Sequence, residues 1–164
     1  MSDAFAFALA AELGSLLSSR GWRVGTAESC TGGLVAAAIT SVVGSSGWFD
    51  AGYVTYADTT KRAMLGVPEG VLREHGAVSE ATARAMAEGA LRASGADIAV
   101  SITGVAGPGG GTPAKPVGTV CLAWALRDRP TEAVRRHFEG DRGAIREASV
   151  VAALEGLIER VRAG

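Results

Sequence analysis

The stretch Ala96-Asp-Ile-Ala-Val-Ser-Ile-Thr103 decides the fold, because Ile98 and Ile102 belong to an almost continuous apolar run. Runs of this kind are typical of a strand that is covered on both faces of a sheet. The chain then enters a segment from Gly104 to Pro116 that holds five glycines and three prolines, which disfavour both helix and strand. The sequence therefore predicts a central strand that ends in a glycine-rich loop.

Beyond the loop, two further strands and a helix are predicted. Val117–Leu126 resumes as a strand, and Glu132–Phe138 would pair with it in a hairpin. Asp141 can cap the start of a helix, because aspartate is a preferred N-cap residue. Apolar residues then recur at helical spacing from Ile145 to Val161. This part of the chain thus predicts a β-hairpin followed by a long amphipathic helix.

Before the central strand, segments with helical periodicity alternate with segments of strand composition. In chain order they are a helix from Phe5 to Gly21, a strand over 22–27, a helix opened by Gly32 and Gly33 and closed at Gly44, a strand over 49–56, a short helix capped by Asp58, and a longer helix from Ser79 to Ala93. We therefore expect an α/β fold: a single three-layer α/β/α domain over residues 1–164 with a mixed, mostly five-stranded sheet.

The overall composition argues against nucleic-acid and membrane partners. Sixteen Lys and Arg residues nearly balance seventeen Asp and Glu residues, so the chain lacks the excess positive charge that marks a nucleic-acid-binding surface. No apolar run is long enough to span a bilayer, and the first residues do not resemble a signal peptide. We therefore expect a soluble, cytoplasmic protein.

Cysteine and histidine are too few and too scattered to suggest a metal centre. Cys30 and Cys121 have no CxxC spacing, and His75 and His137 form no HxH or HxxxH pattern. We expect both cysteines to be reduced thiols and both histidines to lie on the surface. The sequence accordingly predicts neither a metal site nor an organic cofactor.

Three polar, glycine-containing segments follow strands or open helices: Thr26–Gly33, Gly44–Gly47 and Thr103–Gly111. In an α/β sheet such loops gather at the carboxyl ends of the strands, where ligands bind. Ser29 and Thr31 would stand with free backbone N–H groups at a helix start, which suits a phosphate, although an ordinary helix cap has the same composition. The third segment lacks the Walker A residues and could be either a binding loop or a mobile connection.

Tyr56 and Lys61 form the other pair of interest, at the end of a predicted strand and in the first turn of the next helix. Their spacing would let both side chains fold over one pocket. A lysine acts as a general base only when burial or a nearby cation lowers its pKa, and a serine beside it then becomes an activated nucleophile. Taken alone, Lys61 would more often be a solvated helix charge.

Eight ordered segments together resemble the CinA C-terminal domain family over about residues 5–160. They are Thr26-Ala-Glu-Ser-Cys-Thr-Gly-Gly33, Gly44-Ser-Ser-Gly-Trp-Phe49, Val54-Thr-Tyr56, Lys61, His75-Gly-Ala-Val-Ser79, Thr103-Gly-Val-Ala-Gly-Pro108, Lys115-Pro-Val-Gly-Thr119 and Gly140-Asp-Arg142. The resemblance implies a homodimeric domain with nicotinamide-nucleotide amidase activity by a Ser/Lys mechanism. The expected substrate is nicotinamide mononucleotide, deamidated to nicotinic acid mononucleotide and ammonia in pyridine-nucleotide recycling, with neither metal nor cofactor required.

Under this resemblance, the catalytic roles are expected to fall on Ser46, Lys61 and Tyr56. Neutral Lys61 would remove the proton of Ser46, whose hydroxyl would attack the carboxamide carbon. Tyr56 would orient the pair or relay the proton. Backbone N–H groups near Ser45 and Ser46, or at the Thr103–Gly104 turn, would hold the oxyanion.

Ser29 is the competing nucleophile. Its place on the phosphate-like loop favours a binding role, although the sequence leaves an exchange of roles with Ser46 open. The residues expected to bind the substrate are Ser29, Thr31, Gly32, Gly33, Ser45, Thr103, Gly104, Gly107, Gly109 and Arg142.

Two other functions remain open alongside deamidation. A hydrolase of the phosphate bonds of a related nucleotide would need a divalent metal, for which the sequence offers no clustered carboxylates. A non-catalytic nucleotide-sensing module would use the same glycine loops but would not need Lys61 and Tyr56 beside a serine.

The homodimer is expected partly from the resemblance. It is also expected from Trp48 and Trp124, large apolar residues that one small domain would leave partly uncovered.

Overall fold

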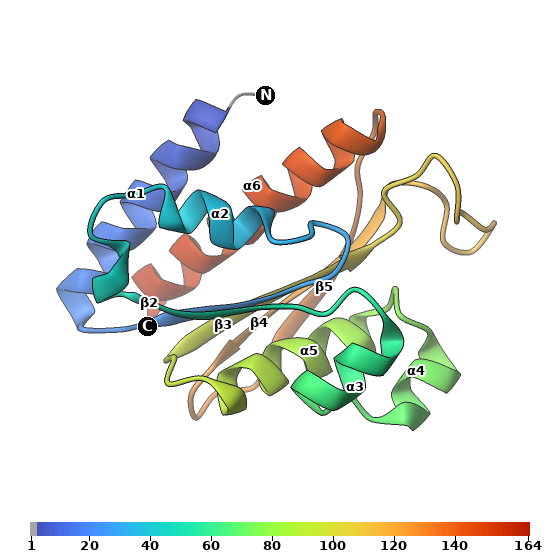
Figure 1. Ribbon diagram of the computed structural model, residues 1–164, viewed down its shortest axis with the longest axis horizontal. Coiled ribbons are helices and arrows are strands. Elements are labelled where there is room, and N and C mark those ends of the chain that lie inside the picture. The colour runs from blue at the N-terminus through green and yellow to red at the C-terminus, as the bar shows by residue number, and fades with distance from the viewer. Residues whose placement is uncertain (1–2) are drawn as a thin grey trace.

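Six α-helices, one 3-10 helix and five strands follow one another along residues 3–164, the part of the chain that the computed structural model describes (Figure 1). In chain order they are α1 (Asp3–Arg20), β1 (Val24–Glu28), α2 (Leu34–Thr40), η1 (Ser45–Gly47), β2 (Phe49–Val54), α3 (Asp58–Leu65), α4 (Glu69–His75), α5 (Glu80–Ala93), β3 (Ile98–Gly104), β4 (Thr119–Leu126), β5 (Glu132–His137) and α6 (Arg142–Ala163). Only the two short helices η1 and α4 go beyond the predicted elements, because a few residues carry too little periodicity to be recognised.

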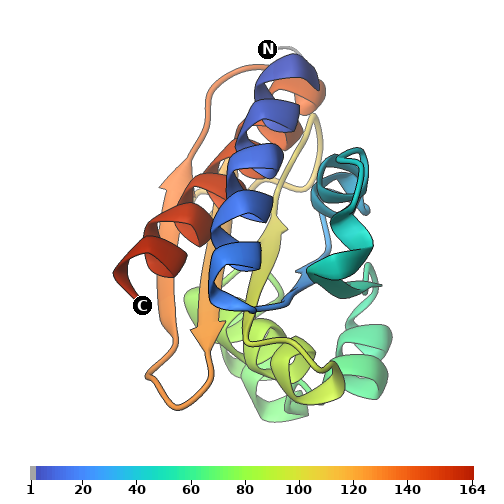
Figure 2. The ribbon, with the colours of Figure 1, turned by 90° about the vertical axis from the view of Figure 1, so that its left-hand side faces the viewer.

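The five strands form one mixed sheet in the order β2-β1-β3-β4-β5. β1 lies between β2 and β3 and runs parallel to both, whereas β4 is antiparallel to β3 and β5 is antiparallel to β4. Helices α1, α2 and α6 cover one face of the sheet, and α3, α4 and α5 cover the other (Figures 1 and 2). The predicted three-layer α/β/α fold with a mixed five-stranded sheet is therefore confirmed.

Strand β3 is the buried centre that the apolar run predicts. Ile98, Val100 and Ile102 lie in the core cluster shared with α1 and α6, while Ala99 lies in the cluster on the α5 side. Successive side chains of a strand point to opposite faces, so each face of β3 contributes to a different core. The strand is thereby fixed from both sides, and its carboxyl end is held at a defined position.

Two of the three predicted helix caps are confirmed. The Ser79 hydroxyl accepts a hydrogen bond from the N–H of Thr82 at the start of α5, and the Asp141 carboxylate accepts one from Ala144 at the start of α6. The prediction for Asp58 is wrong by one position, since Ala57 is the extended residue before α3 and Asp58 is the first helical residue. An acidic side chain still belongs there, because the first turn carries the positive end of the helix dipole.

The two tryptophans are buried, which removes one reason for expecting a dimer. Trp48 and Trp124 are only 5% and 2% exposed. Each ring lies against a helix where a glycine lacks a side chain: a Cβ at Gly14 would stand 2.5 Å from the Trp48 ring, and one at Gly156 would stand 2.2 Å from the Trp124 ring. The expectation that these residues stay partly uncovered is wrong, because the glycines let the helices approach the rings closely.

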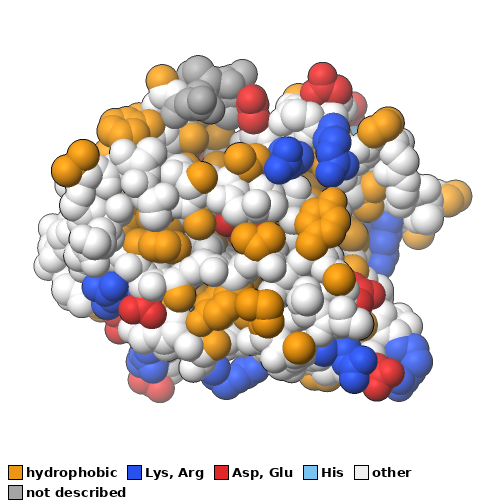
Figure 3. All heavy atoms as spheres, in the orientation of Figure 1, with side chains coloured by type: hydrophobic (Ala, Val, Ile, Leu, Met, Phe, Trp, Pro, Cys, Tyr) orange, Lys and Arg blue, Asp and Glu red, His pale blue; other side chains and the backbone are white. Residues whose placement is uncertain are grey.

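Other apolar side chains do reach the surface. Figure 3 shows them interspersed with charged groups on one face of the molecule. The large exposed ones are Phe5, Phe7, Leu34, Val43, Val54, Tyr56 and Met64. Along residues 3–164, no helix combines the length and the hydropathy needed to cross a bilayer.

Candidate active site

The carboxyl ends of three parallel strands meet at one edge of the sheet. Glu28, the last residue of β1, lies opposite Val54 of β2 and Ile102 of β3. Ser29 continues from β1 between the two neighbours, and its N–H donates to the carbonyl of Ile102 at 2.9 Å. Thr103 is the next residue of β3. Of the three polar segments predicted to gather at this edge, the first and third do so, because parallel strands end on the same side. The prediction is wrong for Gly44–Gly47, which precedes β2.

A buried lysine contacts the Ser29 hydroxyl at this edge. The Lys61 side chain of α3 is 1% exposed, and its Nζ donates to the Ser29 Oγ at 3.0 Å and to the Tyr56 carbonyl oxygen at 2.9 Å. Helix α3 begins soon after β2 ends, so the amine lies over the end of the neighbouring strand β1. The alternative interpretation, in which Lys61 is a solvated charge on the helix surface, is therefore wrong.

Burial sets the ionisation of this amine. Loss of water around the side chain lowers the pKa of Lys61 below its ordinary value, and the Asp58 carboxylate, 3.9 Å from the Nζ, acts against this shift. A neutral amine has a lone pair that can accept the proton of the Ser29 hydroxyl. The pair thus has the geometry and the direction of pKa shift that a general base and its nucleophile require.

The neighbouring cysteine is a poorer nucleophile. Burial raises the pKa of the Cys30 thiol to about 11, so it remains protonated near neutral pH. Both Cys30 and Cys121 are free and buried. Within residues 3–164, no three His, Cys, Asp or Glu side chains come together as possible metal ligands.

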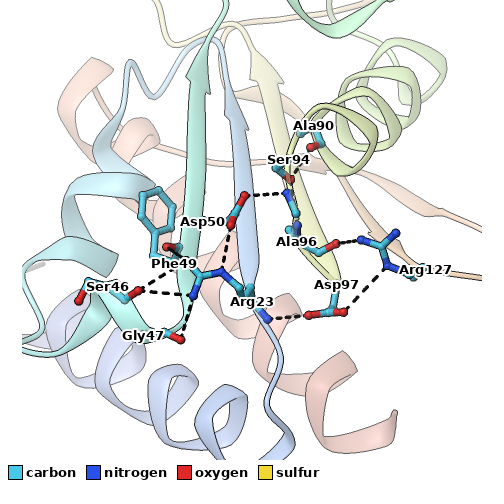
Figure 4. A network of polar contacts seen from close by, with 11 residues as sticks. Arg23, Ser46, Gly47, Phe49, Asp50, Ala90, Ser94, Ala96, Asp97 and Arg127 are labelled. Carbon is cyan, nitrogen blue, oxygen red and sulfur yellow. Dashed lines mark hydrogen bonds and ion pairs between the residues drawn. The ribbon is translucent and has the colours of Figure 1, made fainter.

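Ser46 and Ser45 lie at the opposite edge of the sheet. They belong to η1, which precedes β2, whereas Lys61 follows β2. The six residues of β2 separate the two positions, a distance of about 20 Å at ~3.3 Å per residue. The Ser46 carbonyl instead lies by the Arg23 guanidinium (Figure 4). The structure therefore does not bring Ser46 together with Lys61, and the predicted pairing is replaced by that of Ser29 with Lys61.

The turn after Ser29 holds its own anion. The Glu28 carboxylate accepts hydrogen bonds from the Thr31 hydroxyl at 2.6 Å and from the N–H groups of Val35 and Ala36 at 2.9 and 3.0 Å. These two N–H groups are donors at the start of α2 that a phosphate would have used. The phosphate site predicted at this helix start is consequently filled by the protein itself.

The glycines of that turn have a conformational role. Gly32 and Gly33 both have positive φ, at 57° and 103°. Residues with a Cβ adopt such φ values only rarely. The two glycines let the chain reverse between β1 and α2. Their predicted contact with substrate is not needed to explain their presence.

The phenol of Tyr56 does not contact the lysine. Its side chain is 61% exposed, and its oxygen accepts a hydrogen bond from the Arg142 Nη2 at 3.3 Å. The Nη1 of the same guanidinium donates to the Gly107 carbonyl at 2.8 Å. Tyr56 therefore orients Lys61 through its backbone carbonyl, and Arg142 joins α6 to the glycine-rich loop. Sequence reasoning expected the phenol to do the orienting.

The end of β3 contributes the other predicted loop residues. Thr103 is buried, and its hydroxyl donates to the Ala77 carbonyl at 2.8 Å. Gly104 packs closely on β4, since a Cβ there would stand 2.8 Å from the Val120 side chain. Gly109 lies farther along the loop and is exposed. Thr103 and Gly104 thus lie at the site, while Gly109 belongs to the outer part of the loop.

Two residues of this region were missed from sequence. Glu28 belongs to the first polar segment, but its contacts depend on the chain folding back over a turn and therefore leave no signal in the sequence. The Arg146 guanidinium donates to the carbonyls of Cys30 and Thr31 at 3.1 and 3.3 Å. An arginine on the polar side of an amphipathic helix carries no sequence signal that separates it from a solvated residue.

A groove of about 470 Å³ lies between α1, α2 and α6, on the other side of the sheet from Lys61. Neither Ser29 nor Lys61 lines it, so we place the reacting groups at the sheet edge rather than in this groove. Its lining residues are Ala6, Phe7, Leu34, Ala37, Ala38, Ser41, Gly143, Arg146, Glu147 and Val150.

Comparison with known proteins gives one consistent family. The model of the CinA C-terminal domain matches residues 6–161. The nicotinamide-nucleotide amidohydrolase PncC of Pseudomonas putida is 55% identical over 151 residues, which cover 92% of this chain and 94% of that protein. The protein of the same name from Escherichia coli strain K12 is 49% identical over 157 residues, covering 96% and 95%.

Longer relatives match over only part of their length. The CinA-like protein of Akkermansia muciniphila is 55% identical over 89% of this chain, which spans 35% of that protein. Among solved structures, a competence/damage inducible protein from Agrobacterium tumefaciens matches with a TM-score of 0.92 and 46% identity, covering 97% of this chain and 96% of that one. A CinA superfamily protein from Klebsiella pneumoniae matches with a TM-score of 0.93 and 41% identity, covering 97% and 99%.

Proposed function

The chain belongs to the CinA C-terminal domain family, and from that premise we propose that it hydrolyses the carboxamide of nicotinamide mononucleotide to nicotinic acid mononucleotide and ammonia. Relatives of nearly the same length carry the name nicotinamide-nucleotide amidohydrolase, which supports this substrate. The observation that carries the proposal is the 3.0 Å contact between the buried Lys61 amine and the Ser29 hydroxyl. Ser29 takes the nucleophile's role first predicted for Ser46.

The reaction proceeds through an acyl-enzyme. Neutral Lys61 accepts the proton of Ser29 while the hydroxyl oxygen attacks the carboxamide carbon. The resulting lysine ammonium donates this proton to the leaving nitrogen, and the C–N bond breaks to release ammonia. Water then attacks the ester carbon after losing a proton to Lys61, and the proton returns to the Ser29 oxygen. The products are the acid and the free enzyme.

The surroundings of Ser29 supply the remaining requirements. The Tyr56 carbonyl oxygen accepts hydrogen bonds from the Lys61 Nζ at 2.9 Å and from the Ser29 Oγ at 3.5 Å, so it holds the amine and the hydroxyl beside each other. Backbone N–H groups of Thr103 and Gly104, the last two residues of β3, are the proposed donors to the oxyanion. One well-placed donor contributes roughly 3 kcal/mol in a transition state of this kind.

Arg142 is the proposed partner of the substrate phosphate. The start of α2 is filled by Glu28, so an external anion needs another positive group. The Arg142 guanidinium lies at the same edge, between the Tyr56 phenol and the Gly107 carbonyl. A guanidinium can hold a phosphate through two parallel hydrogen bonds. The remote phosphate can then contribute binding energy to turnover of the ring amide.

The test is to incubate the purified protein with nicotinamide mononucleotide in the presence of a chelator and to follow ammonia and the acid product. We expect stoichiometric release of both, and much slower release from free nicotinamide. A requirement for added metal together with a phosphate product would favour the phosphate-bond hydrolase. Binding without ammonia would favour the nucleotide-sensing module.

We further propose that the protein works in the cytoplasm as a homodimer, in pyridine-nucleotide recycling. The exposed apolar side chains support an association between copies. Light scattering at micromolar concentration should give twice the chain mass, and the mass of a single chain would reject the dimer.

A further inference from the structure

The Glu28 carboxylate is a buried charge that the proposed reaction does not use. Its side chain is 1% exposed, and its three hydrogen-bond partners are a hydroxyl and two backbone N–H groups, all of them neutral. Removing a carboxylate from water is costly unless its oxygens are fully hydrogen-bonded. A charge kept in such a place calls for a role that a neutral residue would fill less well.

The same chain shows how a helix is capped without a buried charge. Helix α5 is capped by Ser79, and α6 by Asp141, each from the residue directly before the helix. The residue in that place before α2 is Gly33, which has no side chain to offer. The cap of α2 comes instead from Glu28, at the end of β1. The carboxylate therefore bridges a strand and a helix across the turn that carries Ser29.

The contacts of Glu28 fix this turn at three points. The residue itself is anchored in β1, where its carbonyl accepts the N–H of Thr55. Thr31 is held in the middle of the turn, and Val35 and Ala36 are held at its far end. Charge-assisted hydrogen bonds are stronger than neutral ones, and the helix dipole favours an anion at this end.

Glu28 and Ser29 point to opposite faces of the sheet. Glu28 contacts α2 on one face, while Ser29 contacts Lys61 of α3 on the other. The carboxylate thus acts on the reaction only through the backbone that joins it to the nucleophile.

We infer that Glu28 is a positioning residue: its carboxylate clamps the turn between β1 and α2 and so holds the Ser29 hydroxyl in line with the Lys61 amine. The inference rests on the proposed function. Displacement of a nucleophile by about 1 Å can reduce turnover by roughly 10²-fold while leaving substrate binding in place. Loss of the clamp should therefore appear in kcat and not in KM.

The experiment compares Glu28→Ala and Glu28→Gln with Ser79→Ala, which removes an ordinary helix cap outside the site. We expect kcat for nicotinamide mononucleotide to fall by roughly 10²-fold in Glu28→Ala and less in Glu28→Gln, which keeps one acceptor oxygen. KM should stay within about threefold. Ser79→Ala should keep its kcat and lose only a few degrees of thermal stability, about 2–4 °C.

Two results would overturn the clamp. One is a kcat loss in both Glu28 variants no greater than that in Ser79→Ala, and the other is a rise in KM in place of the loss in kcat. If Glu28→Ala does not fold, Glu28→Gln has the same size and carries the comparison alone.

Amide hydrogen exchange separates this inference from the proposed function. The N–H groups of Val35 and Ala36 should exchange faster in Glu28→Gln than in the wild-type protein, whatever the substrate is. Unchanged exchange would overturn the clamp by itself. Absence of ammonia release by the wild-type protein would overturn the proposed function and leave the exchange comparison to decide on Glu28.

Discussion

The parallel strands β1, β2 and β3 all begin at one edge of the sheet, the amino edge, and all end at the other, the carboxyl edge. The basic side chains at these two edges have different partners. At the amino edge, the Arg23 guanidinium donates to the Asp50 carboxylate at 2.9 Å and to the carbonyls of Gly47 and Phe49 at 3.1 and 2.8 Å (Figure 4). At the carboxyl edge, the Lys61 amine contacts a hydroxyl and a carbonyl, and its closest carboxylate stands 3.9 Å away. Arg23 has a carboxylate partner within hydrogen-bond distance, whereas the only carboxylate near Lys61 in the described part of the chain is the more distant Asp58.

Ionisation follows these partners. A hydrogen bond from the Gly95 N–H, together with the Arg23 guanidinium, keeps the pKa of Asp50 below its ordinary value, so this group stays charged. Burial lowers the pKa of Lys61 and so favours the neutral form of the amine. The amino edge therefore joins strands through permanent charges, whereas the carboxyl edge holds a group that can exchange a proton. The carboxyl edge is therefore the one suited to acid–base chemistry.

The largest effect should come from Lys61→Met, which keeps an unbranched side chain one atom shorter than lysine and removes the base. We expect kcat to fall by roughly 10³-fold, because the Ser29 hydroxyl loses its proton acceptor. The check is the rate of ammonia release under saturating substrate. Turnover near the wild-type rate would show that Lys61 is not the general base, and the carboxyl edge would then lose its proposed role in proton transfer.

The same variant should show that this amine is kept at a cost in stability. The folded state lowers the pKa of Lys61, so folding is penalised at low pH, where the amine must be buried with its charge. The penalty decreases as the pH rises through the folded-state pKa toward the ordinary lysine value. Lys61→Met should therefore be more stable than the wild-type protein at neutral pH, by a margin that narrows at higher pH. Urea unfolding measures this margin.

The next effect in size concerns Arg142, a cation at the carboxyl edge whose two partners are neutral. Arg142→Ala should raise KM for nicotinamide mononucleotide about 10- to 100-fold, the loss expected for a charged hydrogen-bonded contact with phosphate. Nicotinamide riboside lacks the phosphate and serves as the control substrate. An equal rise in KM for both substrates would mean that Arg142 does not bind the phosphate.

A smaller effect, on stability alone, is expected at the amino edge. Arg23→Met should lower the free energy of unfolding by about 1–2 kcal/mol, a modest loss because the guanidinium is partly exposed. The kcat of the folded protein should not change, since the Arg23 network and the Ser29–Lys61 pair lie at opposite ends of the strands. Urea unfolding and the ammonia assay on the same sample provide the two readings. A large loss of kcat in an Arg23→Met protein that remains folded would show that the Arg23 network at the amino edge affects the reaction.

The smallest effect should be a shift of the pH profile in Asp58→Asn. The Asp58 carboxylate raises the pKa of Lys61 against the effect of burial. Removing its charge should lower that pKa further, so the rising limb of kcat/KM should move to lower pH. A shift to higher pH, or none, would show that Lys61 is not the group that titrates in this limb.

The sequence predicted the fold well because its signals are local. The apolar run over 98–102, the helical spacing after Asp141 and the caps at Ser79 and Asp141 depend on neighbouring residues alone. Helix α4 was not predicted because its seven residues carry too little periodicity, whereas the equally short α2 was recognised with the help of the glycines on either side of it. Patterns of period 2 and 3.6 are therefore enough to recover the layers of this domain.

The site was predicted less well, because it depends on which end of a strand each loop joins. Gly44–Gly47 has the composition of a binding loop, but it precedes β2 and therefore lies at the amino edge, with Ser46. Thr26–Gly33 extends past the end of β1 and brings Ser29 to the carboxyl edge. Whether a loop precedes or follows its strand decides at which edge it lies, and the residue types of the loop alone do not show this. The contacts of Glu28 required the folded turn.

The most direct test of the difference between the edges is the turnover of Ser29→Ala beside that of Ser46→Ala, with unfolding followed in both. Ser29 is the only one of the two that contacts Lys61, so we expect Ser29→Ala to lose roughly 10³-fold or more in kcat. Ser46→Ala should stay within about twofold of the wild-type rate, since its carbonyl and not its side chain contacts Arg23. An active Ser29→Ala beside an inactive, folded Ser46→Ala would contradict the assignment of Ser29 as the nucleophile and place the chemistry at the amino edge.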